Sequence, residues 1–411
     1  MRRGKASSGE ALWGVIVLLA FIAKVAIAFH TFGATDVVTW RSDVAKLKTD
    51  GVESLYRDGI TYSNPDGSLR LYQPFIHPPF IVHLLRAWDA LERATSLPMQ
   101  FWMRLTGAAA DVVSAFLLME ILRLSLYQVG PCRSSLFIVA LSPISLMISG
   151  FHGNTDPVMV AFVVGAVYFL EVRGMPVAAG AALGAALSIK VAALIFAPAL
   201  LLYCGRKSFR FVLAAAATAL VLSSPYLITS TKPVVSVIGP YSSQYGIWGF
   251  SRFAYAFGGD MNGALLIAAK AMLIATIVVC AVHMNRSGKH RPLLVQSAVT
   301  GFAFLALSPG FGVQYLAWTV PWAVALSIPL AVAYQLAGGV FLFLYYNRAA
   351  HGLPWYFADS LHTPVWYGSV VWAGLICWAI CWASLLLALR SRIGSNGRSD
   401  HPRDARFSLP F

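Results

Sequence analysis

The sequence is poor in charge: only 12% of its 411 residues are Asp, Glu, Lys or Arg, whereas 58% are hydrophobic. A soluble domain of this size needs more charged residues to cover its surface. Cysteine is also scarce, and the five cysteines fall in or beside apolar runs, so neither a disulfide framework nor a metal-ligand spacing is expected. The composition therefore predicts an integral membrane protein.

Acidic residues are the scarcer of the two signs, which leaves a net charge of +14. The basic residues form short clusters beside apolar runs, as in MRRGK, GRKSFR and HMNRSGKHR. Short basic loops of this kind stay on the cytoplasmic side, next to anionic lipid. The charge therefore indicates membrane orientation rather than a surface for nucleic acid, and it places both ends of the chain inside.

Several apolar runs reach the length of about 17 to 25 residues that crosses a bilayer. The first, residues 11–30, lacks a following small-residue cleavage site and is expected to be a retained helix. When every basic cluster is placed on the cytoplasmic side, the apolar runs predict an all-α, polytopic bundle of about twelve spans in a single domain, residues 1–411. Residues 31–103 form a polar outer loop with an amphipathic interfacial helix, and residues 391–411 form a basic cytoplasmic tail. The run 175–203 is expected to divide at Lys190 into two short spans.

With this threading, the unusual polar residues collect on the non-cytoplasmic side. Polar groups gathered at one face indicate a site open to the periplasm or a lumen, rather than a transport path through the membrane. The candidates are Asp36, Asp43, His77, His152, Asn154, Asp156, Lys190, Arg252, Gln314 and Tyr315.

Asp36 follows the first apolar run closely, in the segment TDVVTW. A carboxylate just above the membrane surface can act as a general base towards an acceptor hydroxyl. The structural alternative is a helix cap, because ATD can begin a short helix. Asp43 lies two helical turns further on and can share the same face, which makes it a second candidate acid or acceptor contact. His77 in HPPF is another candidate, whereas Pro78 and Pro79 fit a rigid turn.

The motif FHGNTDP places three polar side chains at the mouth of an otherwise apolar hairpin. Since Asp156 precedes Pro157, Asp156 or Asn154 can simply cap the next helix, with proline in its first turn. Capping does not explain His152, whose ring N–H can donate to a phosphate or a sugar hydroxyl.

Lys190, in ALSIKVAAL, is a cation with apolar neighbours, so it needs a counter-charge, water or a bound anion. A lipid phosphate group fits this position, and a structural pair with Asp156 or Asp111 is the alternative. Asp111 lies within the second span, and we expect it to be a structural partner of Lys190 or Arg104. Arg252, in GFSRFAY, is a second candidate for phosphate contact.

The late segment QYLAW lies at the outer start of a helix. Aromatic residues at that level are commonly interface anchors, which is the bland interpretation of Tyr315. Gln314 is less expected as an anchor and is a candidate polar contact.

In order along the chain, these motifs resemble the GT-C class of membrane glycosyltransferases, which use polyprenyl-phosphate sugars. An acid follows the first helix, a proline pair precedes an interfacial helix, and later elements read RLTGAAADVVSAF, LSPISLMISGFHGNTD, GAALGAALSIK and QYLAW. The likeness covers residues 12–321 and is nearest to the GPI mannosyltransferase catalytic subunits and their bacterial relatives. HGNTD departs from those families residue for residue, which leaves the sugar and the acceptor open.

The resemblance implies that Asp36 is the base and that the donor site includes His152, Asn154, Asp156, Lys190, Arg252, Gln314 and Tyr315. It implies inverting transfer of a hexose, with mannose expected, to a lipid-linked or other acceptor. No DxD motif of the nucleotide-sugar enzymes is present in the sequence. No cofactor is expected to be required, although a divalent metal stays open.

Two other functions remain as alternatives. A transporter or lipid-linked-sugar flippase would also have many spans and buried charges, but it predicts polar residues along a path through the membrane. A non-catalytic membrane scaffold would have no need for Asp36. The short basic loops favour a bacterial inner membrane, with the endoplasmic reticulum as the alternative, and the site on the periplasmic or lumenal face.

Overall fold

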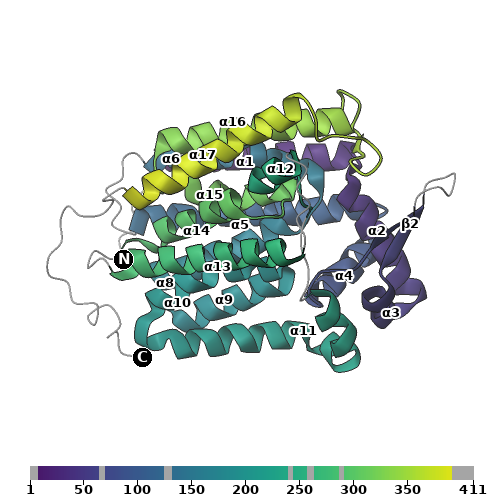
Figure 1. The fold of residues 1–411 in the computed structure, drawn as a ribbon, viewed down its shortest axis with the longest axis horizontal. Helices are drawn as coiled ribbons and strands as arrows, with labels where there is room; N and C mark the ends of the chain where they lie inside the picture. Colours follow the sequence, from purple (N-terminus) through teal and green to yellow (C-terminus); the bar gives the residue numbers. More distant parts are fainter. Residues whose placement is uncertain are drawn as a thin grey trace.

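The computed structural model describes residues 8–63, 70–124, 132–238, 244–256, 263–286 and 291–390. Long helices lie side by side along the length of the molecule, and the shorter elements α2, α3, α4 and β2 gather at one end (Figure 1). The expected basic tail, residues 391–411, and the basic cluster MRRGK lie outside the described residues. The chain is therefore a helical bundle, as the composition predicts.

The elements follow one another along the chain with short connections. Their bounds are α1 Ser8–His30, β1 Gly33–Ala34, α2 Thr35–Thr49, α3 Gly51–Asp58, β2 Ile60–Ser63, β3 Arg70–Gln73, α4 Phe80–Thr95, α5 Met99–Leu124, α6 Cys132–Ala140, α7 Pro143–Met147, η1 Ile148–His152, α8 Asp156–Glu171, α9 Pro176–Ile189, η2 Val191–Phe196, α10 Ala197–Cys204, η3 Gly205–Lys207, α11 Ser208–Ile238, α12 Gly249–Ala256, α13 Gly263–Arg286, α14 Leu293–Leu307, η4 Val313–Thr319, α15 Val320–Ala323, α16 Ile328–Ala349, β4 Phe357–Ala358 and α17 Ser369–Arg390.

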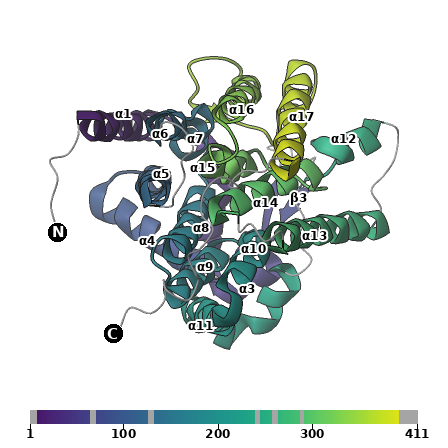
Figure 2. The ribbon, with the colours of Figure 1, turned by 90° about the vertical axis from the view of Figure 1, so that its left-hand side faces the viewer.

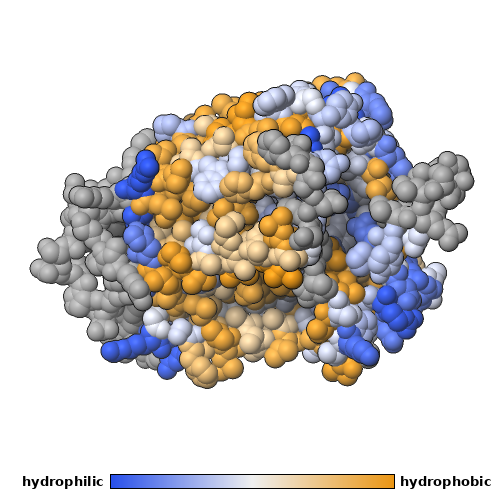
Figure 3. All heavy atoms as spheres, in the orientation of Figure 1, coloured by the Kyte–Doolittle hydropathy of each residue, from blue (hydrophilic) through white to orange (hydrophobic). Residues whose placement is uncertain are grey.

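Six helical stretches among the described residues are long and apolar enough to cross a membrane. They are Leu12–His30, Met99–Arg123, Val191–Ile228, Gly263–Asn285, Ile328–Ala349 and Ser369–Arg390. An apolar belt covers the middle of the molecule, between more polar ends (Figure 3). The chain is thus a multi-pass membrane protein. The other expected crossings fall on shorter helices such as α8, α9 and α14, so the number twelve stays a prediction.

Three boundaries bear on the sequence analysis. The helix that precedes Lys190 ends at Ile189, and Lys190 itself is extended, with φ −154° and ψ 120°, so the expected break is present. The second long helix, α5, begins at Met99, directly after Pro98, a residue that favours a helix start. The long helix α11 continues past a kink at Ser230 and ends at Ile238.

The bundle is organised around α8, α9 and α10. Figure 2 shows these three helices in the middle, with α16 and α17 on one side and α11 on the opposite side. At the end that carries α2 and α3, the amphipathic helix α4 buries Ile81, Val82, Leu85 and Trp88, which recur at the spacing of one helical face. The expected helix in the first outer loop is therefore present, packed on the bundle by its apolar side.

Two short β-ribbons stabilise the same end. Strands β2 and β3 form an antiparallel hairpin in which Ile60 pairs with Gln73. Strands β1 and β4 pair in parallel, with Gly33 opposite Phe357 and Ala34 opposite Ala358. The second pairing joins the segment that follows α1 to the connection between α16 and α17, which lies far away in the sequence.

Candidate active site

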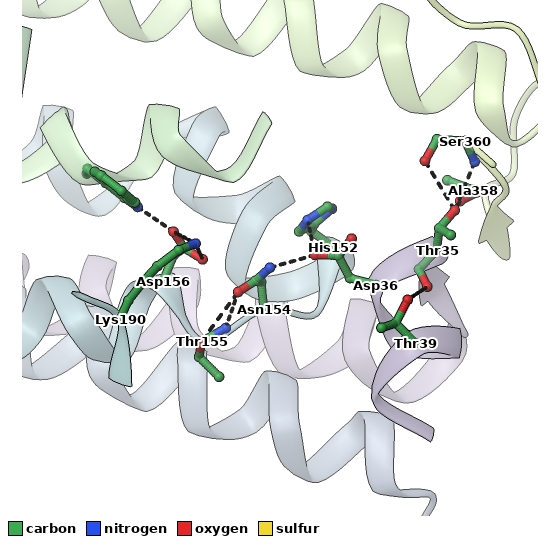
Figure 4. A network of polar contacts seen from close by, with 11 residues as sticks. Thr35, Asp36, Thr39, His152, Asn154, Thr155, Asp156, Lys190, Ala358 and Ser360 are labelled. Atoms are coloured by element: carbon green, nitrogen blue, oxygen red, sulfur yellow. Dashed lines mark hydrogen bonds and ion pairs between the residues drawn. The ribbon is translucent and has the colours of Figure 1, made fainter. Parts of the chain in front are cut away.

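Asp36 lies in the first turn of α2, where the chain turns away from the end of α1. The N-cap position of α2 is Ala34, which makes no side-chain capping bond. The partners of the Asp36 carboxylate are side chains of residues 152–154 (Figure 4). Asp36 therefore points into the bundle instead of capping its own helix.

The Asp36 carboxylate is held by two buried polar side chains. Asn154 Nδ2 donates to Asp36 Oδ2 at 2.5 Å, and His152 Nε2 lies 3.2 Å from the same oxygen. Asn154 Oδ1 accepts from the Thr155 backbone N–H at 2.6 Å, which orients the amide so that its NH2 group faces Asp36. His152 and Asn154 are 4% and 6% exposed, whereas the Asp36 side chain is 36% exposed. A substrate can thus reach the carboxylate while its supporting groups stay buried.

The backbone of the FHGNTDP segment explains how His152 and Asn154 reach Asp36. Residues Ile148–His152 form a π-helical turn, a wide turn that is rare and is often found at functional sites. Gly153 follows with φ +81°, a conformation that L side chains rarely adopt. A Cβ atom at Gly153 would also lie 2.6 Å from Val37 Cγ2. Glycine is therefore required for the close approach of this turn to α2.

A second polar group lies deeper in the bundle, around Asp156. The Lys190 ammonium lies 2.9 Å from Asp156 Oδ1 and 3.0 Å from Oδ2, and the indole N–H of Trp318 also donates to Oδ1. Lys190 stands over the rings of Tyr315 and Trp318, 4.9 and 5.4 Å from their centroids. Of the two alternatives for Lys190, the structure contains the pair with Asp156, which lies beyond Asn154 as seen from Asp36 (Figure 4).

The expectation for Asp111 is wrong. Its carboxylate pairs with Lys24 on α1, at 2.6 Å, and not with Lys190 or Arg104. Arg104 instead donates to the carbonyl oxygens of Ala28 and Thr31, at 2.8 and 2.6 Å, where α1 ends. The partner could not be chosen from the sequence because it depends on which helices are neighbours. Lys24 itself was missed, although a lysine within the first apolar run is a detectable signal.

The electrostatic surroundings keep Asp36 ionised. Burial by itself raises the pKa of Asp36, but the charge of His152 and its close approach, the hydrogen bond from Asn154 and the charge of Lys190 outweigh it, so the pKa lies below its ordinary value. An ionised, reachable carboxylate is the form that accepts a proton.

His77 lies close to this group on the turn before α4. Its ring packs on Trp40 of α2 with a centroid distance of 4.4 Å, and its backbone carbonyl accepts from the Tyr56 hydroxyl at 2.7 Å. Burial and the positive charge of Lys190 lower the pKa of His77 to about 3. His77 is therefore neutral at physiological pH and offers a hydrogen bond rather than a charge.

Asp43 and Arg252 do not join the Asp36 group. Asp43 is 3% exposed on the packed face of α2, and burial raises its pKa to about 8, so it is mainly protonated at pH 7. Arg252 lies on α12, where its guanidinium donates to the Gly246 carbonyl at 3.4 Å and stands over the Tyr255 ring. Among the described residues, neither side chain has a contact with Asp36, His152 or Asn154.

Tyr315 lies beneath the site, and Gln314 precedes it at the start of η4. The Tyr315 ring packs against Trp318 at 4.5 Å, on the same side as the Lys190 ammonium. Tyr315 thus helps to enclose the Lys190–Asp156 pair, while Gln314 is only half-buried. Within the described ranges, no group of three or more His, Cys, Asp or Glu side chains is placed to hold a metal ion.

The connection between α16 and α17 braces the start of α2, which the sequence did not indicate. Thr35 Oγ1 accepts from the Ser360 backbone N–H at 2.9 Å and donates to the Ala358 carbonyl at 3.2 Å. Together with the β1–β4 pairing, these bonds fix the residue immediately before Asp36.

An apolar groove of about 590 Å³ lies between α1, α7 and α16. Leu336, Val340 and Phe343 line its α16 side and are 61%, 54% and 41% exposed. Phe151 and Trp355 also line it, and their rings are 5.4 Å apart. Phe151 is the residue before His152, so the groove ends beside the Asp36 group.

No family model and no curated protein matches the chain. Among solved structures, the chain is similar to the crystal structure of ArnT from Cupriavidus metallidurans bound to undecaprenyl phosphate. The two share 12% sequence identity with a TM-score of 0.49, over 94% of this chain and 77% of that chain. A likeness at this level carries no information about the residues or the chemistry of the site.

Proposed function

We propose that this chain is a membrane glycosyltransferase of the GT-C class that uses a polyprenyl-phosphate sugar, with Asp36 as its general base. The observation that carries the proposal is the ionised, partly exposed Asp36 carboxylate at one end of a membrane bundle, held by buried His152 and Asn154. The motif order of the sequence supports the class. A mannose donor and a lipid-linked acceptor are the specific substrates that we propose.

The apolar groove supports a substrate that arrives from the lipid. Its α16 side is formed by exposed apolar side chains, and Phe151 links it to His152. A polyprenyl chain that moves from lipid into such a groove exchanges contacts with lipid tails for van der Waals contacts with these side chains, because lipid is as apolar as the groove. Its phosphate-linked sugar would then lie next to Asp36.

The proposed reaction is a single displacement. Asp36 takes the proton of the acceptor hydroxyl, and the acceptor oxygen forms a bond to the anomeric carbon. The bond from that carbon to the phosphate oxygen breaks, and polyprenyl phosphate leaves with the electron pair. One displacement inverts the anomeric configuration.

The donor phosphate needs hydrogen-bond donors where its charge develops. His152 fits this role because both of its ring nitrogens are buried and neither makes a hydrogen bond to any described residue. Lys190 is already bound by Asp156, so we assign it to the positive potential beneath the site rather than to direct phosphate contact. Arg252, Gln314 and Tyr315 remain proposed donor contacts on the resemblance alone.

The test is sugar transfer by purified protein in lipid nanodiscs, from polyprenyl-phosphate mannose or polyprenyl-phosphate glucose to a bacterial lipid extract. Asp36→Asn removes the base without a change of shape, and Glu53→Gln is the matched control at an exposed acid of α3. The proposal expects transfer by the wild type and by Glu53→Gln, and loss of transfer in folded Asp36→Asn. Full activity of Asp36→Asn would exclude it as the base.

A transporter or flippase is the second candidate, and the Lys24–Asp111 pair is the observation that favours it. A buried charge pair inside a bundle is common along transport paths. Here Ser145 and Ser149 also donate to Asp111, so its carboxylate is enclosed by donors. The protein would be reconstituted into liposomes of the same lipid. Movement of labelled lipid across that bilayer, without any sugar transfer, would favour the transporter.

A further inference from the structure

A buried polar cluster links α1, α5 and the segment that carries the site. Lys24 of α1 is 4% exposed, and its ammonium donates to Asp111 Oδ2 at 2.6 Å and to Ser145 Oγ at 2.7 Å. Ser145 Oγ donates to the same carboxylate oxygen at 2.6 Å, and Ser149 Oγ donates there as well. One oxygen of Asp111 therefore receives three donors from two other parts of the bundle.

The cluster is connected directly to the site through the chain. Ser149 is the second residue of the π-helical turn Ile148–His152, and His152 is its last residue. Ser145 lies in α7, the helix that leads into this turn. A Cβ atom at Gly150 would lie 3.2 Å from Lys24 Cα, so the backbone of α1 is in close contact with the turn. The cluster and the π-helical turn are therefore joined by direct contacts.

We propose that Lys24 and Asp111 are positioning residues, which hold the π-helical turn in the one register that presents His152 and Asn154 to Asp36. The inference rests on the proposed role of Asp36 as the base. It goes further because it gives a function to an ion pair that does not contact the site.

The hydrogen bond from Ser149 serves both the π-helical turn and the Asp111 carboxylate. A π-helical turn uses wider hydrogen bonding than an α-helix, so it needs support from outside its own backbone. A shift of the turn by one residue would move Ser149 away from Asp111 and leave a carboxylate that is only 21% exposed with fewer donors, which costs stability inside the bundle. The ion pair thus makes alternative registers unfavourable. Misplacement of a supporting group by about 1 Å can lower a rate by about 100-fold.

Ser149→Ala is the mildest test, because it removes the bond from the turn and keeps the ion pair. Ser114→Ala is the matched control: Ser114 is also buried, lies one turn from Asp111 on α5, and its one hydrogen bond within the described part of the chain goes to the Ala110 carbonyl. A double variant, Lys24→Met with Asp111→Leu, removes both charges together and so avoids an unpaired buried charge that would block folding.

The first readout is the pH midpoint for carbodiimide labelling of Asp36, followed by mass spectrometry, which needs no turnover. The groups that face Asp36 are His152 of η1, His77 before α4, Lys190 after α9, and Tyr345 and Tyr346 of α16. If the turn moves, His152 and Asn154 no longer stabilise the ionised form of Asp36. The midpoint is then expected at higher pH in Ser149→Ala and in the double variant, and unchanged in Ser114→Ala.

The second readout is transfer kinetics with polyprenyl-phosphate mannose. We expect a kcat at least about tenfold lower with an unchanged KM, since a positioning residue affects alignment and not binding. Folded variants with the wild-type labelling midpoint would overturn the inference. If the variants show a shifted midpoint but the wild type itself transfers no sugar, the positioning role stands and the result counts against the proposed glycosyltransferase instead.

Discussion

Asn154 donates its side-chain amide to the Asp36 carboxylate at 2.5 Å, across 118 positions of sequence. This bond joins the first turn of α2 to the segment between η1 and α8, the two places where the sequence carries its most unusual polar residues. The amide supplies a hydrogen bond without a charge. It therefore favours the ionised carboxylate and leaves the negative charge available to a proton.

Asn154→Asp is expected to move the acidic limb of the pH–rate profile to higher pH. Two carboxylates at this distance cannot both ionise easily, so the pKa of the pair rises. At neutral pH we expect kcat to fall, with partial recovery as the pH is raised. The measurement is the transfer rate against pH for the wild type, for this variant and for the control Asn285→Asp. Asn285 lies in the last turn of α13. An unshifted limb in Asn154→Asp would contradict the role given to Asn154.

Gly153→Ala is expected to destabilise the protein and to lower its activity. The new Cβ would lie 2.6 Å from Val37 Cγ2, and the positive φ of this position adds backbone strain of about 1 kcal/mol. Val37→Ala in the same chain removes the clash but not the strain, so thermal unfolding should recover in part. No recovery in the double variant would mean that the contact with Val37 does not limit this turn.

Asp43→Asn is expected to change how stability depends on pH. Burial raises the folded-state pKa of Asp43 from 3.8 to about 8, so the folded state binds more protons than the unfolded state between these values. Stability therefore falls as the pH rises through that window, by about 1.4 kcal/mol for each pH unit from this group, and levels off above pH 8. Thermal unfolding from pH 5 to 9 should show a shallower decline in Asp43→Asn, and an unaltered decline in Glu53→Gln. Equal slopes for wild type and Asp43→Asn would argue against a buried neutral carboxyl.

Thr35→Val is expected to loosen the connection between α16 and α17. The valine keeps the shape but loses the bonds to the Ser360 N–H and the Ala358 carbonyl, each worth about 1 kcal/mol. Limited proteolysis should cleave residues 350–368 faster, and the transfer rate should fall several-fold because Asp36 follows Thr35. Thr39→Val, one turn further along α2, provides the control. Cleavage at the wild-type rate would show that the β1–β4 pairing holds this connection without Thr35.

Val340→Trp is expected to obstruct the apolar groove. Val340 is 54% exposed within the groove, so a larger side chain fills space without a clash in the packed core. We expect KM for a long-chain polyprenyl-phosphate sugar to rise about tenfold, while a short-chain analogue is used as before. Ile376→Trp, at a 58% exposed position on α17 outside the groove, should change neither value. An equal effect on both chain lengths would place the lipid elsewhere.

Local pattern was enough to predict the helices, several boundaries and the position of the polar motifs. Uninterrupted apolar runs can satisfy their backbone in a membrane only as helices, which is why α1, α5 and α17 were foreseeable. Lys190 interrupts its apolar run, and the helix ends beside it. FHGNTDP leads into α8, which begins at the Asp156 of this motif and has Pro157 in its first turn, as the proline rule predicts.

The partners of the buried charges were decided by tertiary structure alone. Asp111 could pair with any cation that a neighbouring helix brought near, and the packing of α1 on α5 selected Lys24. The bond between Asn154 and Asp36 and the pairing of β1 with β4 likewise join distant segments. Helical periodicity shows which residues share a face, but lipid is as apolar as the helix surface, so apolar pattern does not say which faces meet. Small packing differences and a few polar contacts make that choice, and they exist only once the helices are assembled.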